Sequence, residues 1–148
     1  MIDLSNYTDF VPKSVDIWDD IASRYTREDI ELMICDDSRM RSINLESRGI
    51  DSTTDVLSFP YDSGEFDTLD MSHMPLGSIV ISIDRARAKA DELGHSIDDE
   101  LTLLFTHGLL HIVGFDHERD NGEMRDEESK IIAKFDLPKS LIVRADIV

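Results

Sequence analysis

The sequence predicts an α+β fold, with a small mixed sheet of about four strands packed against helices. Two observations support this prediction. Segments in which apolar residues alternate with polar ones, as in strands, are interspersed with segments of helical periodicity. A long, almost wholly apolar helix then follows the last predicted strand, as expected of a helix at the centre of a core. With 148 residues, the chain is predicted to form one domain, spanning 1–148.

The first half of the chain is predicted to begin with a short edge strand at 2–5. A helix follows at 12–25, where proline suits the first turn and apolar residues recur at spacings of three and four. Trp18 lies on this apolar stripe and is predicted to anchor the core. Residues 29–35 alternate and then become continuously apolar, which is typical of a strand with one covered end. Cys35 ends this strand and is expected to be a small buried hydrophobe.

The next helix is predicted from caps at 36–38 through about Glu46, before Gly49. Residues 54–60 predict a strand that stops at proline, and 61–75 predict an acidic loop that contains His73. The remaining elements are a strand at 76–83, a helix at 85–93 capped by Asp84, a helix at 96–113 capped by Ser96, and a last helix at 118–135.

Three of the five histidines, His107, His111 and His117, fall within eleven residues on and after the predicted core helix. His107 and His111 are four residues apart, so their side chains share one helix face and can reach the same metal ion. Gly114 is expected to end the helix, because glycine adopts the left-handed conformation freely, and His117 can then turn back as a third ligand. Three protein ligands leave a fourth position for water, as in catalytic zinc sites. A hydrogen-bonded histidine cluster without metal is the alternative.

The spacing of these histidines is that of the metzincin proteases, H-E-x-x-H-x-x-G-x-x-H. Gly108 stands where those proteases have their glutamate general base. The predicted ligands are therefore present, and the protease base is absent.

Three segments resemble the YbeY family of bacterial endoribonucleases and rRNA maturation factors. They are His-Gly-Leu-Leu-His-Ile-Val-Gly-Phe-Asp-His at 107–117, Arg48 followed by Thr-Asp-Val-Leu-Ser-Phe-Pro at 54–60, and Leu-Gly-Ser-Ile-Val-Ile-Ser at 76–82. Ser78 departs from the family pattern, in which aspartate is usual. The resemblance implies a zincin-like architecture with a metal-binding core helix.

The same resemblance implies a single-strand-specific, metal-dependent endoribonuclease that acts in 16S rRNA 3′-end maturation and ribosome quality control. His107, His111 and His117 would hold Zn²⁺, with Ni²⁺ or another divalent transition metal as an alternative, and a metal-activated water would attack. These histidines and Arg48 are the implied catalytic residues, and a guanidinium suits this role because it binds phosphate with two parallel hydrogen bonds. The implied partners are rRNA and, further, ribosomal proteins or a ribosome-associated GTPase.

The composition weighs against RNA, because 15 basic and 32 acidic residues give a net charge of −17. Two other functions therefore stay open. One is a zincin-like metallohydrolase of peptide or acyl substrates, against which Gly108 counts. The other is a non-catalytic ribosome-assembly factor with a structural metal. Asp116, next to the third ligand, is expected to accept a hydrogen bond from an imidazole or to stabilise a turn. Arg85, Arg87 and Lys89 form the densest basic cluster, which predicts a solvated surface or an RNA-facing rim.

The N-terminus shows no signal-peptide pattern, and no apolar run approaches the 18 residues of a membrane span. A single cysteine allows no internal disulfide, in agreement with a reducing compartment. We therefore expect a cytoplasmic protein with no membrane association.

Overall fold

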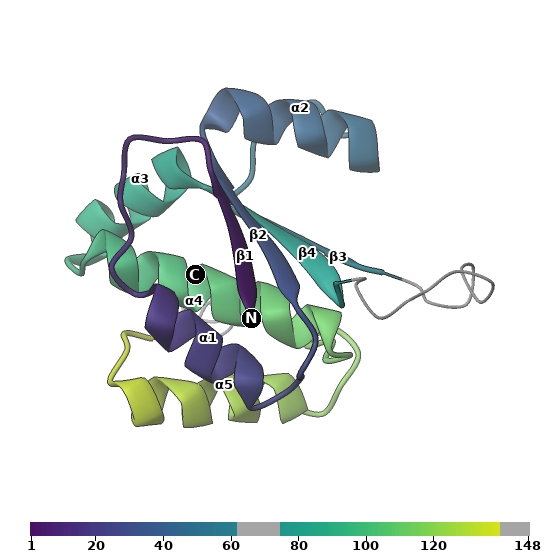
Figure 1. Cartoon of the computed structure of the whole chain (residues 1–148), viewed down its shortest axis with the longest axis vertical. Helices are drawn as coiled ribbons and strands as arrows, with labels where there is room; N and C mark the ends of the chain where they lie inside the picture. Colours follow the sequence, from purple (N-terminus) through teal and green to yellow (C-terminus); the bar gives the residue numbers. More distant parts are fainter. Residues whose placement is uncertain (62–74, 140–148) are drawn as a thin grey trace.

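The computed structural model describes residues 1–61 and 75–139. Its centre is a four-stranded sheet with strand order β1-β2-β4-β3 (Figure 1). The strands are β1 (Ile2–Asn6), β2 (Ile30–Cys35), β3 (Val56–Pro60) and β4 (Gly77–Ser82). The first three strands in that order run parallel, and β3 pairs with β4 in the antiparallel sense. The prediction of a mixed α+β fold is confirmed, and β1 lies at an edge as expected.

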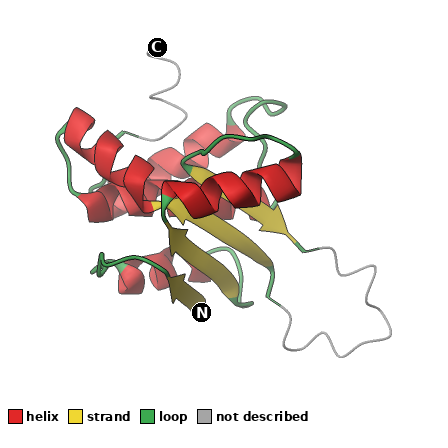
Figure 2. Cartoon of the chain, turned by 90° about the horizontal axis from the view of Figure 1, so that it is seen from above, coloured by secondary structure: helices red, strands yellow, loops and turns green. Residues whose placement is uncertain are grey.

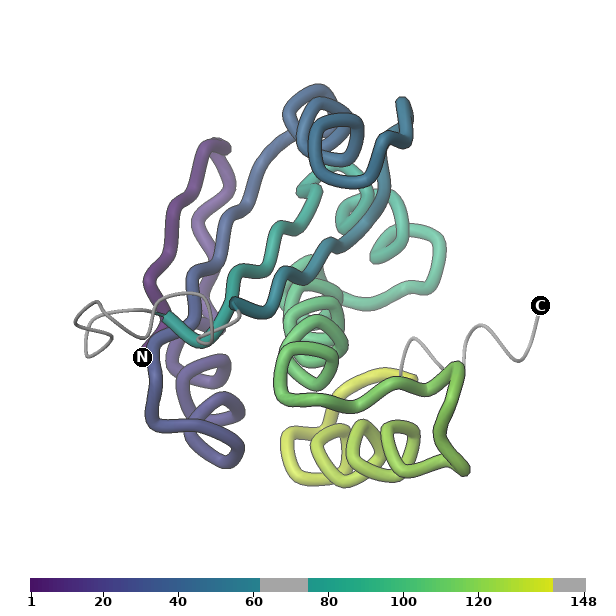
Figure 3. The backbone as a smooth tube through the Cα atoms, turned by 90° about the vertical axis from the view of Figure 1, so that its right-hand side faces the viewer, coloured from purple at the N-terminus to yellow at the C-terminus, as the bar shows by residue number. Residues whose placement is uncertain are grey.

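The described part of the chain contains five helices. They are α1 (Val15–Ser23), α2 (Asp37–Arg48), α3 (Ile83–Leu93), α4 (Ile97–Ile112) and α5 (Glu123–Phe135). The α4 helix crosses beneath the sheet, with α1 beside it, whereas α2 lies on the opposite face (Figures 1 and 3). Seen from above, the helices enclose the strands on both faces, so the sheet is the middle layer (Figure 2). None of the helices in the described part combines the length and hydrophobicity needed to span a membrane.

The main core lies between the sheet and α4. Alternate residues of β2 and β4 face it, including Ile30, Leu32 and Ile79, as the period of two in a strand requires. Trp18 of α1 is fully buried there: its indole N–H donates a 2.7 Å hydrogen bond to the Thr102 hydroxyl of α4. The prediction of Trp18 as a core anchor is confirmed, and α4 is held tightly against its neighbours.

The other face of the sheet has a smaller core beneath α2. Cys35, Met40, Leu57 and Val80 are buried in it. The expectation of a buried Cys35 is therefore confirmed, and burial raises the pKa of its thiol to about 11. This second core fixes α2, and so determines where the end of α2 lies relative to β3.

Three predicted helix starts are wrong. The first helix begins at Val15 rather than at 12, so proline precedes it. Local hydrogen bonds explain the other two. The cap of α3 is Ser82, which accepts a hydrogen bond from the Arg85 N–H, whereas Asp84 accepts one from the Asp37 N–H instead. The last helix begins at Glu123 rather than at 118, since the chain first forms a turn in which the Asp120 carboxylate accepts backbone hydrogen bonds. The sequence predicts an acidic loop at 61–75 that contains His73. His73 and most of this loop lie outside the described residues.

Candidate metal centre

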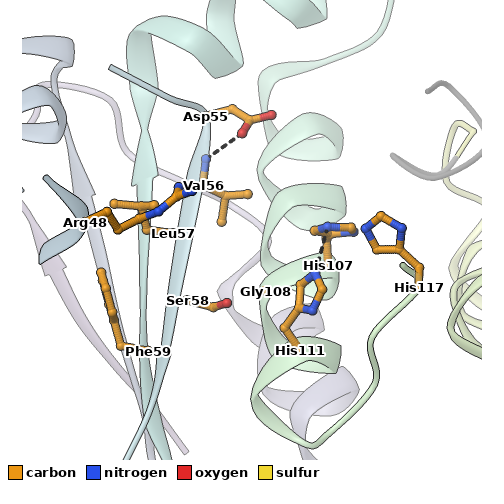
Figure 4. A pocket seen from close by; sticks show the side chains of 10 residues that line it. All are labelled: Arg48, Asp55, Val56, Leu57, Ser58, Phe59, His107, Gly108, His111 and His117. Atoms are coloured by element: carbon orange, nitrogen blue, oxygen red, sulfur yellow. Dashed lines mark hydrogen bonds between the residues drawn. The ribbon is translucent and has the colours of Figure 1, made fainter. Parts of the chain in front are cut away.

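Three imidazoles converge on one point at the end of α4. His107 and His111 lie one turn apart on the helix, and their Nε2 atoms are 3.2 Å from each other. His117 comes from the following loop, and one nitrogen from each ring lies within 4.8 Å of the others (Figure 4). Nitrogen atoms about 2.0–2.1 Å from a common ion would lie at such separations. The geometry of the three rings therefore fits one transition-metal ion.

The backbone around the triad explains why the rings meet. Helix α4 is buried on almost every side, so packing restricts the side-chain rotamers of its two histidines. The helix ends at Ile112, and Gly114 has a φ of +109°, a conformation that other residues adopt at a steric cost. This turn reverses the chain and brings His117 back to the helix. The prediction that Gly114 allows the third histidine to return is confirmed.

The Nδ1 atoms of the two helical histidines each have a hydrogen-bond partner. His111 Nδ1 is 3.1 Å from the Phe115 carbonyl oxygen, and His107 Nδ1 is 2.8 Å from Oε1 of Glu128 in α5. Asp116 was expected either to accept from an imidazole or to stabilise a turn, and the structure shows the second role. Its carboxylate accepts a hydrogen bond from the Glu118 N–H and pairs with an exposed arginine.

Glu128 is a site residue that the sequence reasoning missed. It lies between Met124 and Ile131 on the buried face of α5, and its side chain is only 3% exposed. The available signal was a carboxylate at helical spacing among apolar residues. A charge on such a face requires a buried partner.

The pKa of His111 lies below its ordinary value of 6.5, mainly because of burial and secondly because of the neighbouring His107. Below pH 6.5 the unfolded chain therefore binds a proton at this position more readily than the folded protein does. It follows that the free energy of unfolding of the metal-free protein falls as the pH drops below 6.5. Urea unfolding above and below that pH measures the loss. His111→Gln is expected to show a smaller loss, and an equal loss in both proteins would contradict the assignment.

The histidines form one wall of a pocket with a volume of about 490 Å³. Strand β3 forms the opposite wall, and the Ser58 hydroxyl points from it toward the histidines (Figure 4). Arg48, the last residue of α2, lines the same pocket on the side away from the histidines (Figure 4). The structure thus places all four predicted site residues around one cavity. Asp55 also lines it, but its carboxylate accepts a hydrogen bond from the Val56 N–H at the start of β3.

Arg48 is exposed, and no ion pair to it is found within residues 1–61 and 75–139. Arg41, on the same helix, differs because it forms a 2.7 Å ion pair with Asp51.

The predicted basic cluster of Arg85, Arg87 and Lys89 is partly neutralised by acidic residues. Arg85 pairs with Asp37 at 3.6 Å, and Lys89 pairs with a glutamate at 3.2 Å. Of these cations, Arg48 is the one that lines the histidine pocket.

Gly108 lies at a close approach of α4 to the sheet. A Cβ atom at this position would be 3.1 Å from Cγ2 of Ile79, a fully buried residue of β4. At the position where a metzincin has its general base, this chain therefore has a glycine that allows close helix–sheet packing. This finding counts against a protease mechanism of that type.

Gly108→Glu, which restores the metzincin pattern, is expected to lower the free energy of unfolding by about 1–3 kcal/mol through overpacking. Replacing a helical glycine ordinarily stabilises a helix by about 0.5–1 kcal/mol, so a loss would identify the steric conflict. Urea unfolding measures the change, and a peptide substrate tests for new activity. A variant as stable as wild type that cleaves peptides would contradict this explanation.

The fold and the histidine triad together define a zincin-like metalloprotein. A family model described as "Endoribonuclease YbeY" matches residues 2–136, and the chain belongs to this family. A protein of Nautilia profundicola named "Endoribonuclease YbeY" is 52% identical over 144 residues, covering 97% of this chain and 98% of the relative. A Campylobacter jejuni protein of the same name is 54% identical over 129 residues, covering 87% and 91%.

The fold has a counterpart among solved structures. The solution structure of TM1509 from Thermotoga maritima matches with a TM-score of 0.62 and covers 91% of both chains. The sequence identity is 21%, so this likeness concerns the fold alone.

Proposed function

We propose that this protein is a metal-dependent endoribonuclease that hydrolyses phosphodiester bonds in single-stranded RNA. The observation that supports it most strongly is one pocket in which three imidazole nitrogens within 4.8 Å of one another lie opposite an exposed guanidinium. The membership of the YbeY family gives the substrate class, because its named relatives are endoribonucleases.

His107, His111 and His117 would hold the ion through neutral imidazoles, and three such ligands suit Zn²⁺, with Ni²⁺ as the alternative. A divalent ion in this position would supply an activated water near neutral pH, because it lowers the pKa of bound water to about 7. Gly108 provides no base, so the proposed reaction needs none at that position. The Ser58 hydroxyl faces the same space and would donate a hydrogen bond to a phosphate oxygen.

Arg48 would bind the scissile phosphate and offset the charge that develops on its oxygens during hydrolysis. Its guanidinium is available for this role, since no carboxylate in the described residues pairs with it. This arrangement also answers the objection from the net charge of −17. Charges more than about 8 Å away are screened at physiological salt, so the local groups decide whether phosphate binds.

The size of the pocket favours single strands. About 490 Å³ is in the range of a small-molecule site, enough for one nucleotide and too little for a duplex. Bases can enter such a pocket only when they are unpaired, as in loops and strand ends. We propose the 3′ end of 16S rRNA as the substrate and ribosome quality control as the context. Ribosomal proteins or a ribosome-associated GTPase would be partners, and the location would be the cytoplasm.

The test is cleavage of an RNA oligonucleotide that contains the 16S rRNA 3′-end sequence, offered single-stranded and annealed to its complement. We expect cleavage of the single strand alone, its loss after chelation, and its return when Zn²⁺ is added. Cleavage that persists after chelation would indicate a contaminating nuclease. A metal-loaded protein that leaves both RNA forms intact would contradict the proposal and favour a non-catalytic role in ribosome assembly.

A further inference from the structure

Glu128 is the buried carboxylate of α5, and its single described hydrogen bond goes to the metal centre. Oε1 accepts from His107 Nδ1 at 2.8 Å, and the side chain is 3% exposed. The other oxygen, Oε2, is buried and has no hydrogen-bond partner within the described residues. Burying a carboxylate with one oxygen that lacks a hydrogen bond is costly unless a nearby positive charge compensates it. The environment of Glu128 therefore suits a cation bound to the other nitrogen of the His107 ring, whose charge would stabilise the carboxylate.

The hydrogen bond also determines which nitrogen of His107 is free to bind an ion. A carboxylate accepts but does not donate, so the proton of a neutral His107 ring resides on Nδ1. The lone pair is then on Nε2, the atom that lies 3.2 Å from Nε2 of His111. Glu128 thus selects the tautomer in which His107 Nε2 points at the proposed ion.

The position of Glu128 links the metal centre to α5. The proposed ligands come from α4 and from the loop after it, whereas Glu128 comes from a separate helix. Helix α5 packs beneath α4 rather than on the sheet (Figure 3). Its apolar contacts are Met124 against Leu110 and the buried Ile131 in the main core, with Phe135 partly buried against that core. The contact between Glu128 and His107 adds a polar link between α5 and α4.

We propose that Glu128 is a positioning residue that fixes the tautomer of His107 and couples metal binding to the docking of α5. The proposal rests on the metal site of the proposed function, but it does not depend on RNA cleavage. Ion binding at the triad should tighten α5, and a loose α5 should weaken ion binding, because such coupling is reciprocal.

The first test compares Zn²⁺ affinities by competition with a chromophoric chelator. Glu128→Gln keeps the shape and one acceptor oxygen but removes the charge, and we expect affinity to fall about 10- to 100-fold. Two variants serve as matched controls. Glu127→Gln changes the neighbouring residue, which bonds Tyr25 instead. Glu100→Gln alters a carboxylate that is 1% exposed and bonds His95, outside the triad. Both controls should bind Zn²⁺ as wild type does.

The second test uses the wild-type protein and remains informative if Glu128→Gln folds poorly. Hydrogen exchange of the backbone amides should slow in α5 when Zn²⁺ is added, and nitrogen NMR should show His107 protonated at Nδ1 in the metal-free protein. Ile131→Ala, which loosens the packing of α5 without removing the carboxylate, should weaken Zn²⁺ binding, because the coupling is reciprocal.

The outcomes separate this proposal from the one on which it rests. If wild-type protein binds no Zn²⁺, the proposed metal site is wrong. If wild type binds Zn²⁺ and Glu128→Gln binds it equally well, or if α5 exchange does not respond to Zn²⁺, the site stands and the role of Glu128 is overturned.

Discussion

His111→Ala should abolish both retention of the metal and cleavage of RNA. His111 is the central ligand of the proposed site, because it follows His107 by one helical turn and precedes the loop that returns His117. Two imidazoles leave the ion weakly held, and without the ion the pKa of water is no longer lowered to about 7. We expect cleavage to fall at least about 1,000-fold, to the level of chelated wild type. Metal analysis and single-strand cleavage measure the two losses.

The control for this variant is His95→Gln, which alters a histidine that pairs with Glu100 at the other end of α4. It should keep one ion per chain and full activity. Circular dichroism should show that His111→Ala remains folded, since the core side chains of α4 are unchanged. Full cleavage by a folded, metal-free His111→Ala protein would exclude the triad as the catalytic centre.

Arg48→Ala should keep the metal and the fold while losing most of the activity. Arg48 is exposed at the end of α2 and contributes no side chain to either core. Loss of a group that stabilises transition-state charge commonly lowers kcat about 100- to 1,000-fold. Arg48→Lys should recover part of that loss, because an ammonium keeps the charge but cannot form two parallel hydrogen bonds. Single-turnover cleavage with saturating RNA measures the effect on the chemical step.

Arg41→Ala is the matched control, because Arg41 is also exposed on α2 but pairs with Asp51 and lies outside the histidine pocket. Activity near the wild-type level is expected for it. If Arg48→Ala released the metal or unfolded the protein, its role would be structural. If Arg41→Ala reduced cleavage as strongly, the effect would reflect general attraction of RNA rather than a contact in the pocket.

The features that local sequence patterns determine were predicted well. The strand periodicities, the buried α4 helix and the spacing of the three histidines depend on neighbours within a few residues, and the structure contains all of them. The mixed sheet also follows from the order of the elements. Arg48 was linked to the histidines through the family resemblance, because spacing along the chain gives no information on pairing between β3 and β4.

The wrong predictions concern side chains with several possible partners. For Asp116, the sequence allowed either an imidazole or its own turn as the partner, and the structure shows the turn. Asp84 was assigned as a cap, yet the strand residue Ser82 takes that position. Glu128 lies far from His107 in sequence and becomes its neighbour only when α5 packs on α4. Such contacts depend on tertiary structure and leave only weak local signals.

The compact spacing of the histidines has a consequence for the order of events during refolding. The three rings are brought together by closing one short loop, which costs little chain entropy. Arg48 reaches the same pocket only after β3 has paired with β4 and α2 has packed on the sheet, contacts that are distant in sequence and slower to form. A partly folded chain can therefore capture its ion before it can cleave RNA. During refolding, recovery of nuclease activity is therefore expected to follow recovery of ion binding.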